Sequence, residues 1–376
     1  MNKKLISILY SMERHAHIKM VQLRQRLWYE SDIYSMKQKM IQCELIALSK
    51  TQEREIKTYW KSISGYDIPV YWHQYFYSRN GIFSKQYVPT CLYHSRIIYR
   101  LNCRQLTKAY TDKCAYDEFF RDVWRPKTIV RNINGCFYDD RKAIKREEAV
   151  AICSDLDDAV IKPSMDGMWG MGVRAFSSEK GRVTEYETVD GLFDKMGMNY
   201  IVQKKVRQHH EMSRLNPTSL NTLRVLSFRH GDEVAVLYAV VRIGRKNQIV
   251  DNETAGGINA DIDLNSGRII DCAYGLPSEK RIEYTDVGTR LKGFLIPSFD
   301  EVISMVKDLH LRLPYFHLVG WDLGIDEEGK PVMIEWNRTP DLSQTAHGPA
   351  FGDRTEEIVR FAMSQPDTFD ARLWNG

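Results

Sequence analysis

Alternating apolar and polar residues near the end of the chain predict a β-hairpin. Two runs rich in apolar and β-branched residues, 318–325 and 331–337, flank a polar turn, which is typical of paired antiparallel strands. If residues 328–329 form a two-residue loop, Asp322 lies directly opposite Glu335 and the two side chains share one face. A bulge at the turn glycine would shift this pairing by one residue, so the register is an inference.

The same period-2 pattern assigns the two faces of the second strand. It places Val332, Ile334 and Trp336 on one side and Met333, Glu335 and Asn337 on the other. Glycines on both sides of Asp322 are expected to leave the acidic face open.

Periodicity elsewhere predicts an α+β fold with an antiparallel sheet. Residues 1–60 carry apolar positions at helical spacing, whereas residues 61–108 are rich in Tyr and Trp and indicate irregular structure with turns. Helices are expected at 145–154 and 299–311. The expected strands are 127–131, 135–138, 160–162, 173–176, 200–202, 223–228, 234–242, 249–251, 257–263 and 268–273.

Two facing carboxylates repel each other unless a cation lies between them. Their hard oxygen atoms suit Mg²⁺, which takes one or two carboxylates and completes its coordination sphere with water and phosphate oxygens. The alternative is a solvated edge hairpin whose acids face water. The candidate metal ligands are Asp322, Glu335 and Asn337.

Length and composition limit the class of protein. A chain of 376 residues suggests two or three domains, and 43% hydrophobic with 27% charged residues is typical of a soluble globular protein. The seven cysteines form no CxxC pair and no signal-peptide pattern is present. We therefore expect a reduced, cytoplasmic setting without disulfides or a zinc site, and no apolar run is long enough to span a bilayer.

Positive charge is concentrated at the start of the chain. Residues 1–60 hold eleven Lys and Arg against six Asp and Glu, interleaved with apolar residues at helical spacing. Such a face is often simply solvated, and peripheral contact with an anionic membrane stays open. No nucleic-acid motif accompanies it, so we do not expect nucleic acid as a partner.

A glycine-rich loop after a predicted strand indicates contact with an anion. Residues 163–173, PSMDGMWGMGV, contain three glycines, which let backbone N–H groups approach a phosphate. The loop matches neither Walker A nor GxGxxG, so a mobile turn is the alternative. Lys162, at the end of the preceding strand, would place a positive charge on phosphates.

The order of these features resembles the ATP-grasp superfamily, and within it the sugar-transfer-associated family of polysaccharide-biosynthesis loci. The resemblance covers about residues 59–357. The motifs that carry it are Asp112-Lys113, Val160-Ile-Lys-Pro163 with the glycine loop, Val202-Gln-Lys-Lys-Val206, Ser219-Leu-Asn-Thr-Leu-Arg224, Val241-Arg-Ile-Gly244, Val250-Asp-Asn252 with Gly256-Gly257, Val319-Gly-Trp-Asp322 and Glu335-x-Asn337.

The resemblance implies a binding role for matched residues. Lys113 and Lys162 would contact the phosphates of ATP, and two Mg²⁺ ions would bind at the hairpin ligands. Glu211 is the nearest candidate for a ribose contact, because basic residues crowd the usual position. The lid over the phosphates would contain Asp166, Gly167, Gly170 and Gly172, and the adenine hinge would be Gln203, Lys204, Lys205 and Val206.

The resemblance also implies a catalytic side. Arg224 and Arg242 would stabilise the transferring phosphoryl group, and Asn221 and Asn252 would line the acceptor side. No Ser-His or Cys-His arrangement suggests an acyl-enzyme. The implied activity is a Mg-ATP-dependent carboxylate–amine ligase that forms an amide through an acyl phosphate and releases ADP.

The family's fold, two α+β subdomains gripping ATP, is expected here with a helical, aromatic-rich N-terminal region. The expected parts are residues 1–108 on the acceptor side, 109–205 as the small (lid) subdomain and 206–376 as the large subdomain with the metal site. The expected partners are a small-molecule or sugar-linked acid and an amine acceptor, while the oligomeric state stays open. The alternatives are a phosphotransferase on a sugar-related acceptor and a non-catalytic nucleotide-binding protein.

Overall fold

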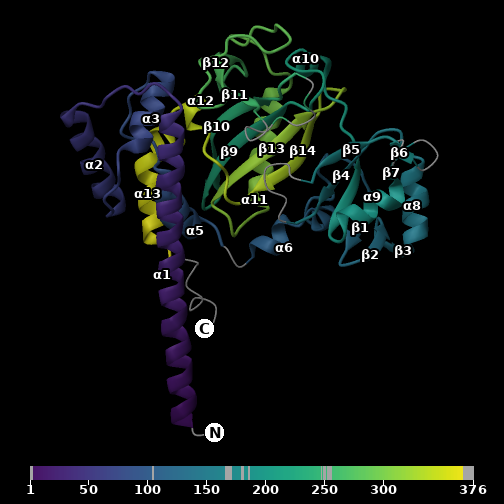
Figure 1. The fold of residues 1–376 in the computed structure, drawn as a ribbon, viewed down its shortest axis with the longest axis horizontal. Helices are drawn as coiled ribbons and strands as arrows, with labels where there is room; N and C mark the ends of the chain where they lie inside the picture. The colour runs from purple at the N-terminus through teal and green to yellow at the C-terminus, as the bar shows by residue number, and fades with distance from the viewer. Residues whose placement is uncertain are drawn as a thin grey trace.

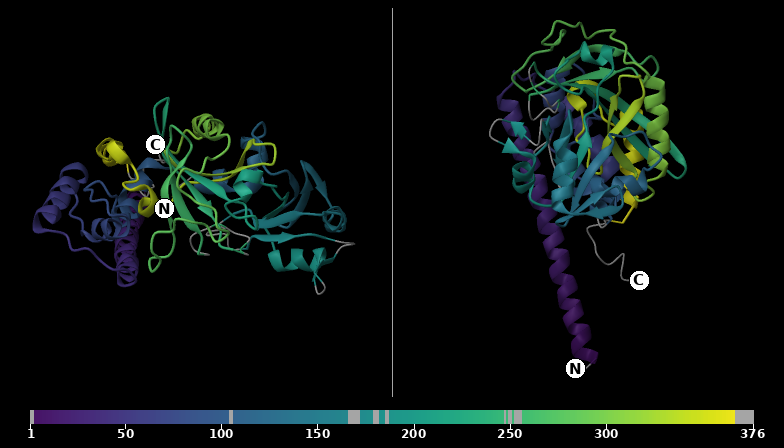
Figure 2. Two further views of the ribbon diagram at one scale, coloured as in Figure 1. Left: turned by 90° about the horizontal axis from the view of Figure 1, so that it is seen from above. Right: turned by 90° about the vertical axis from the view of Figure 1, so that its right-hand side faces the viewer.

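The computed structural model describes residues 3–103, 106–165, 172–178, 182–184, 187–246, 248, 251 and 256–366. Their strands form two six-stranded sheets and one two-stranded sheet. The N-terminal helices lie at one end of the molecule, the sheet that contains β9 to β14 lies in the middle, and the other large sheet lies at the opposite end (Figures 1 and 2). The predicted α+β class is confirmed.

The N-terminal region is mainly helical, so the irregular structure predicted for residues 61–108 is wrong. Gly65 and Gly81 lie at helix ends, where each glycine has a positive φ, 78° and 77°. Trp60, Trp72 and Tyr87 are completely buried, so the aromatic residues build this region's core. The elements are α1 (Lys3–Ile41), α2 (Lys50–Ser64), α3 (Tyr71–Asn80), α4 (Thr90–Leu92), η1 (Tyr93–Ile97), α5 (Ile98–Leu101) and α6 (Thr107–Thr111).

The smaller subdomain is built on a sheet with the order β3-β2-β1-β8-β4-β5. The strands predicted at 127–131 and 135–138 pair as a hairpin that turns at Asn134-Gly135, with positive φ at both residues. Helices α8 and α9 pack together beside this sheet. The elements are η2 (Lys113–Ala115), α7 (Tyr116–Phe119), β1 (Thr128–Ile133), β2 (Cys136–Asp139), β3 (Lys142–Ile144), α8 (Arg146–Ser154), β4 (Ala159–Pro163), β5 (Arg174–Phe176), β6 (Arg182–Thr184), β7 (Glu187–Thr188), α9 (Val189–Met196) and β8 (Tyr200–Lys204).

The central sheet is antiparallel throughout, with the order β12-β11-β10-β9-β13-β14. Helix α11 covers one face and shares a core with alternate strand residues such as Val225, Val241 and Trp321. The strand predicted at 249–251 falls largely outside the described residues. The elements are α10 (His210–Ser213), β9 (Thr222–His230), β10 (Glu233–Ile243), β11 (Ile258–Ile262), β12 (Ile269–Tyr274), α11 (Phe299–Leu311), β13 (Leu318–Ile325) and β14 (Pro331–Asn337).

The opposite face of the central sheet is covered at one end by helices from both ends of the chain. Helix α13 (Thr355–Ser364) packs against α2 and α5 and lies among the N-terminal helices in Figure 1. Phe228 and Tyr238 of the sheet belong to the same core as these helices. Two further short elements are α12 (Gln344–His347) and η4 (Gly352–Arg354). The division at residues 108 and 205 stays a prediction.

Candidate active site

Asp322 and Glu335 face each other across the hairpin, as predicted. The route to this pairing differs from the expectation. Ile325 pairs with Pro331 around a turn in which Gly329 has a φ of 84°, so the register starts one residue away from that of a two-residue loop. The register shifts back between Asp322 and Leu323, because an extra residue bulges from β14. The two departures cancel.

The bulge overturns part of the predicted face assignment. Met333 packs in the same core as Trp336, not on the side of Glu335. The acidic face is also less open than expected, because Pro340 and Leu220 cover its two glycines. A Cβ added to Gly320 would lie 2.5 Å from Cβ of Pro340, so only glycine allows this close approach.

A row of directly opposed residues crosses five strands of the central sheet. Glu335 pairs with Asp322, Asp322 with Arg224, Arg224 with Val240, and Val240 with Asp261. Opposed residues on neighbouring antiparallel strands point to the same side of a sheet. The two predicted metal-binding carboxylates, a predicted catalytic arginine and a further carboxylate therefore lie on one face.

Four hydrogen bonds saturate the carboxylate of Asp322. Its Oδ1 accepts from Nε of Arg224 at 2.6 Å and from Nη1 of Arg242 at 3.3 Å. Its Oδ2 accepts from Nη2 of Arg224 at 2.9 Å and from Nδ2 of Asn337 at 3.0 Å. A carboxylate offers about four acceptor positions, so every one is in use. Asp322 anchors both arginines and the amide.

The two arginines hold Asp322 in its charged form. Burial alone would raise the pKa of this carboxyl, but Arg224 and Arg242 outweigh burial and lower its pKa to about 2. Arg224 is equally enclosed, with 6% of its side chain exposed, and makes a bidentate pair. Arg242 makes a single longer contact and is 17% exposed, so it is the freer of the two.

Two lysines reach this face from the other subdomain. Lys113 is positioned by its backbone N–H, which donates to the carbonyl of Ser164 at 2.9 Å, and its Nζ lies 3.1 Å from Oε2 of Glu335. Lys162 projects from β4 and is buried. Burial and the neighbouring charge of Lys113 lower the pKa of Lys162 to about 8. The predicted lysines and carboxylates are therefore brought together.

The predicted hinge connects the two sheets. Gln203 is buried on β8, and its side chain donates to the carbonyl of Pro126 at 3.3 Å. Beyond β8 the chain crosses to the central sheet, where the backbone N–H of His209 donates to the carbonyl of Ile325 at 2.9 Å. Among the other predicted contacts, Lys204 and Lys205 are exposed, Val206 is half-buried and Glu211 pairs with Arg214.

Some predicted residues lie elsewhere or are not described. Asn221 is fully buried, and its amide donates to carbonyls of Met212 and Asn216 at 2.9 and 2.8 Å. Its side chain braces a loop in this structure, and its place on the acceptor side stays a prediction. Gly172 has a φ of 79°. Asp166, Gly167, Gly170 and Asn252 lie outside the described residues.

Sequence reasoning missed an Asp-His pair at the far end of the row. Oδ1 of Asp261 lies 2.9 Å from Nδ1 of His347, and the imidazole stacks on Tyr238 with ring centroids 4.8 Å apart. An aspartate at Nδ1 fixes the ring proton there and leaves Nε2 as an acceptor. The two residues are distant in sequence and belong to no shared motif, so only the fold reveals the pair.

The donor set at the hairpin fits Mg²⁺. Glu335 is 29% exposed on its side chain and meets one lysine, so its carboxylate is accessible. Asn337 donates its amide N–H to Asp322 from the next position on the same face, which leaves its amide oxygen as an acceptor that could bind a cation. Asp322 can bind a cation only after one of its four donors withdraws, and the 3.3 Å contact from Arg242 is the longest of them. Two carboxylates and an amide are the hard oxygen ligands this cation takes.

Comparisons with known proteins extend this picture. No curated protein matches the chain in sequence. Among solved structures, the ATP-grasp ligase PsnB complexed with minimal precursor is similar at 13% identity and a TM-score of 0.40, over 71% of this chain and 64% of that chain. D-alanyl-alanine synthetase A from Vibrio cholerae is 11% identical, with a TM-score of 0.42 over 70% of this chain and 67% of that one.

An L-amino acid ligase from Bacillus licheniformis is likewise 11% identical, with a TM-score of 0.39 over 69% of this chain and 49% of that one. The chain thus spans less than two thirds of the length of two of these three proteins. The decisive comparison is with protein families, where residues 93–360 match the family described as sugar-transfer associated ATP-grasp. The chain belongs to the sugar-transfer associated ATP-grasp family.

Proposed function

We propose that this protein is a Mg-ATP-dependent carboxylate–amine ligase that activates an acid as its acyl phosphate and joins it to an amine. The observation that carries the proposal is the convergence of Lys113 and Lys162 from one subdomain on the row Glu335, Asp322 and Arg224 of the other. A cationic wall facing paired carboxylates suits a polyphosphate with a bound divalent cation.

The charges of the site favour the binding of a polyphosphate. Lys162 is buried beside Lys113, and the two cations disfavour each other. Phosphate oxygens placed between them would relieve that repulsion. Lys113 also pairs with Glu335, so a phosphate that drew the lysine away would free the carboxylate for Mg²⁺.

The two arginines would then have different tasks. Arg224, bidentate and buried, positions Asp322. Arg242, held by one 3.3 Å contact, is free to turn toward the phosphoryl group in transfer. Mg²⁺ held by Glu335, Asn337 and the freed position on Asp322 would neutralise charge on the phosphates.

The Asp261–His347 pair is suited to the acceptor step. An amine must lose a proton when it attacks the acyl phosphate, and an imidazole oriented by a carboxylate is a suitable base. The pair lies on the same face as Arg242, two strands beyond Arg224. We assign the acceptor amine to that side of the site.

The sugar character of the substrate rests on the family's description alone. The aromatic segment of residues 59–77 adds no support, because Trp60, Trp72 and Tyr75 are buried and offer no ring face to a ligand. We propose a sugar or sugar-linked precursor from polysaccharide biosynthesis as one of the two substrates.

A screen of acids and amines for ADP release in the presence of Mg²⁺ tests this function. With the correct acid, hydroxylamine should replace the amine and give a hydroxamate with stoichiometric ADP and phosphate. The reason is that hydroxylamine attacks the carbonyl carbon of an acyl phosphate and displaces the phosphate. Glu335→Gln is the inactive control. Release of AMP and pyrophosphate, or a stable phosphorylated product that resists hydroxylamine, would contradict the ligase and favour the phosphotransferase.

A further inference from the structure

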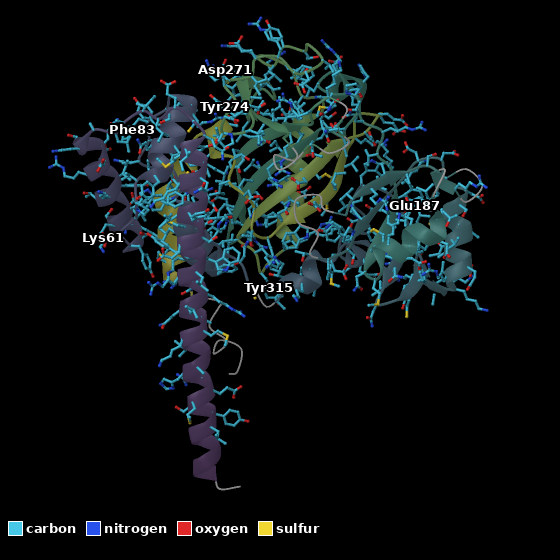
Figure 3. The ribbon with its side chains drawn as sticks, in the orientation of Figure 1. Lys61, Phe83, Glu187, Asp271, Tyr274 and Tyr315 are labelled. Atoms are coloured by element: carbon cyan, nitrogen blue, oxygen red, sulfur yellow. The ribbon has the colours of Figure 1, made fainter. Side chains whose placement is uncertain are left out.

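Helix α1 has two apolar faces, and only one of them packs on the body. It spans 39 residues and contacts α3, α4 and η1 through a side that includes buried Met36 and Gln25. Its N-terminal part projects from the body with no described element beside it (Figures 1 and 2). Figure 3 shows side chains standing clear around this part of the helix.

The second apolar face runs along the opposite side of α1. Successive residues of a helix are rotated by about 100° around its axis, and on this basis the members of the second face fall within an arc of about 80° on the side opposite Met36. Leu23, Leu27 and Ile41 are 56%, 58% and 77% exposed. The face, which we call the outer stripe, consists of Leu9, Met12, Met20, Leu23, Leu27, Tyr34 and Ile41.

Basic residues border the outer stripe. Lys19 and Arg26 lie along one edge and Arg24 along the other, by the same helical geometry. Arg26 is 3.8 Å from the carboxylate of Glu30 at that edge, an exposed pair that water and salt screen. Lys37, on the same edge, lies over the ring of Tyr71. Over α1 as a whole there are eight Lys and Arg against three Asp and Glu, a net charge of five positive. Long basic side chains beside an apolar stripe can extend toward phosphate groups while the apolar residues enter the lipid.

We propose that the outer stripe docks α1 flat on an anionic membrane surface. The charge favours this occupant over a second copy of the chain, because pairing two stripes would bring two strongly positive helices together. Met20, Leu27, Tyr34 and Ile41 recur every seven residues, as in a coiled-coil seam, but the alternate seam positions after Leu23 hold the charged residues Glu30 and Lys37, which a seam would bury. Among the described residues no helix could cross a membrane, so the contact is peripheral.

Flotation of the full-length protein with vesicles tests the docking without nucleotide, and so independently of the proposed ligase. Vesicles of phosphatidylcholine with about one third phosphatidylglycerol should bind it at least about tenfold more tightly than pure phosphatidylcholine. The difference should shrink at high salt, because the electrostatic part is screened.

Two paired variants separate the contributions. Leu23→Gln with Leu27→Gln removes apolar contact without changing charge or helix propensity, and should weaken vesicle binding by about tenfold or more. Lys19→Gln with Arg26→Gln keeps the stripe and should remove most of the preference for phosphatidylglycerol. All four positions are exposed, so the thermal melting of both variants should match the wild type.

Light scattering decides between the proposed occupant and a second copy. A wild-type protein that ignores both kinds of vesicle overturns the proposal. A dimer that Leu23→Gln with Leu27→Gln converts to a monomer, without any vesicle binding, would assign the stripe to a second copy instead.

Discussion

At the scale of single residues, two carboxylates that look equivalent in sequence do different work in the structure. Asp322 is 5% exposed and holds Arg224, Arg242 and Asn337, whereas Glu335 meets one lysine at the edge of the site. The sequence predicted the two strands from their alternation and turn, but the facing of the two carboxylates was confirmed only because the turn and the bulge shift the register in opposite directions. It could not predict the arginine contacts, which depend on a neighbouring strand far away in sequence.

This difference predicts that Asp322→Asn lowers the free energy of unfolding far more than Glu335→Gln does. Asp322→Asn leaves the buried charge of Arg224 without its partner and should cost about 3–5 kcal/mol of unfolding free energy. Glu335→Gln should change stability by about 1 kcal/mol or less but abolish turnover, because it removes a charge at the metal. Urea unfolding of both variants measures the contrast, and equal losses of stability would contradict it.

Lys162 predicts a pH dependence of nucleotide binding. Its pKa is lowered to about 8, so the free protein carries the charge below that pH and loses it above. ATP affinity should therefore fall as the pH rises from 7 to beyond 8. Lys162→Met is the control. It should bind ATP more weakly and show no fall in affinity near pH 8, so any pH dependence that remains in this variant comes from other groups, such as the nucleotide. A wild-type profile parallel to that of Lys162→Met would exclude Lys162 as the titrating group.

Stability should show the reverse trend in the alkaline range. The unfolded chain keeps this lysine protonated up to its ordinary pKa of 10.5, while the folded protein releases the proton near 8. The unfolded state thus binds more protons between these values, and the Lys162 contribution to stability rises with pH there. Wild-type minus Lys162→Met unfolding free energies, measured across that range, should increase.

At the scale of elements, local signals predicted the strands and helices that have a clear hydrophobic period. The hairpin and helix α11 match their predicted bounds because each has a clear period and a turn or polar boundary. The helices between residues 61 and 108 were missed because their aromatic residues indicate no helical period, and because Gly65 and Gly81 terminate helices as readily as they form turns. The bulge in β14 was equally invisible, since it depends on how the turn sets the register.

Gly320 provides a test of the hairpin's packing. Gly320→Ala would place a Cβ 2.5 Å from Pro340, so the segment after β14 must shift and stability should drop by about 1–3 kcal/mol. Gly191→Ala is a suitable control, since its added Cβ meets nothing closer than 3.4 Å, and it should unfold close to wild type. Equal stability of the two variants would contradict the close approach of Pro340.

At the scale of the whole molecule, the N-terminal helices and the central sheet share one core. Residues from α2, α5 and α13 pack with Phe228 and Tyr238 of the sheet. Removal of residues 1–108 should therefore expose this core and give an insoluble or unfolded chain. Removal of residues 1–24 takes away mainly the projecting part of α1 and should leave the melting temperature within a few degrees of wild type. Solubility and circular dichroism of the two truncations check this, and a well-folded 109–376 fragment would contradict it.

The central claim is that the lysines of one subdomain and the carboxylates of the other form one Mg-ATP site. Calorimetric titration of ATP into the wild type with Mg²⁺, and again with a chelator, tests it most directly. We expect binding with Mg²⁺ that is weakened by about tenfold or more by the chelator, and by Lys113→Ala even when Mg²⁺ is present. Equal affinity with and without the metal, or unchanged binding by Lys113→Ala, would contradict the claim.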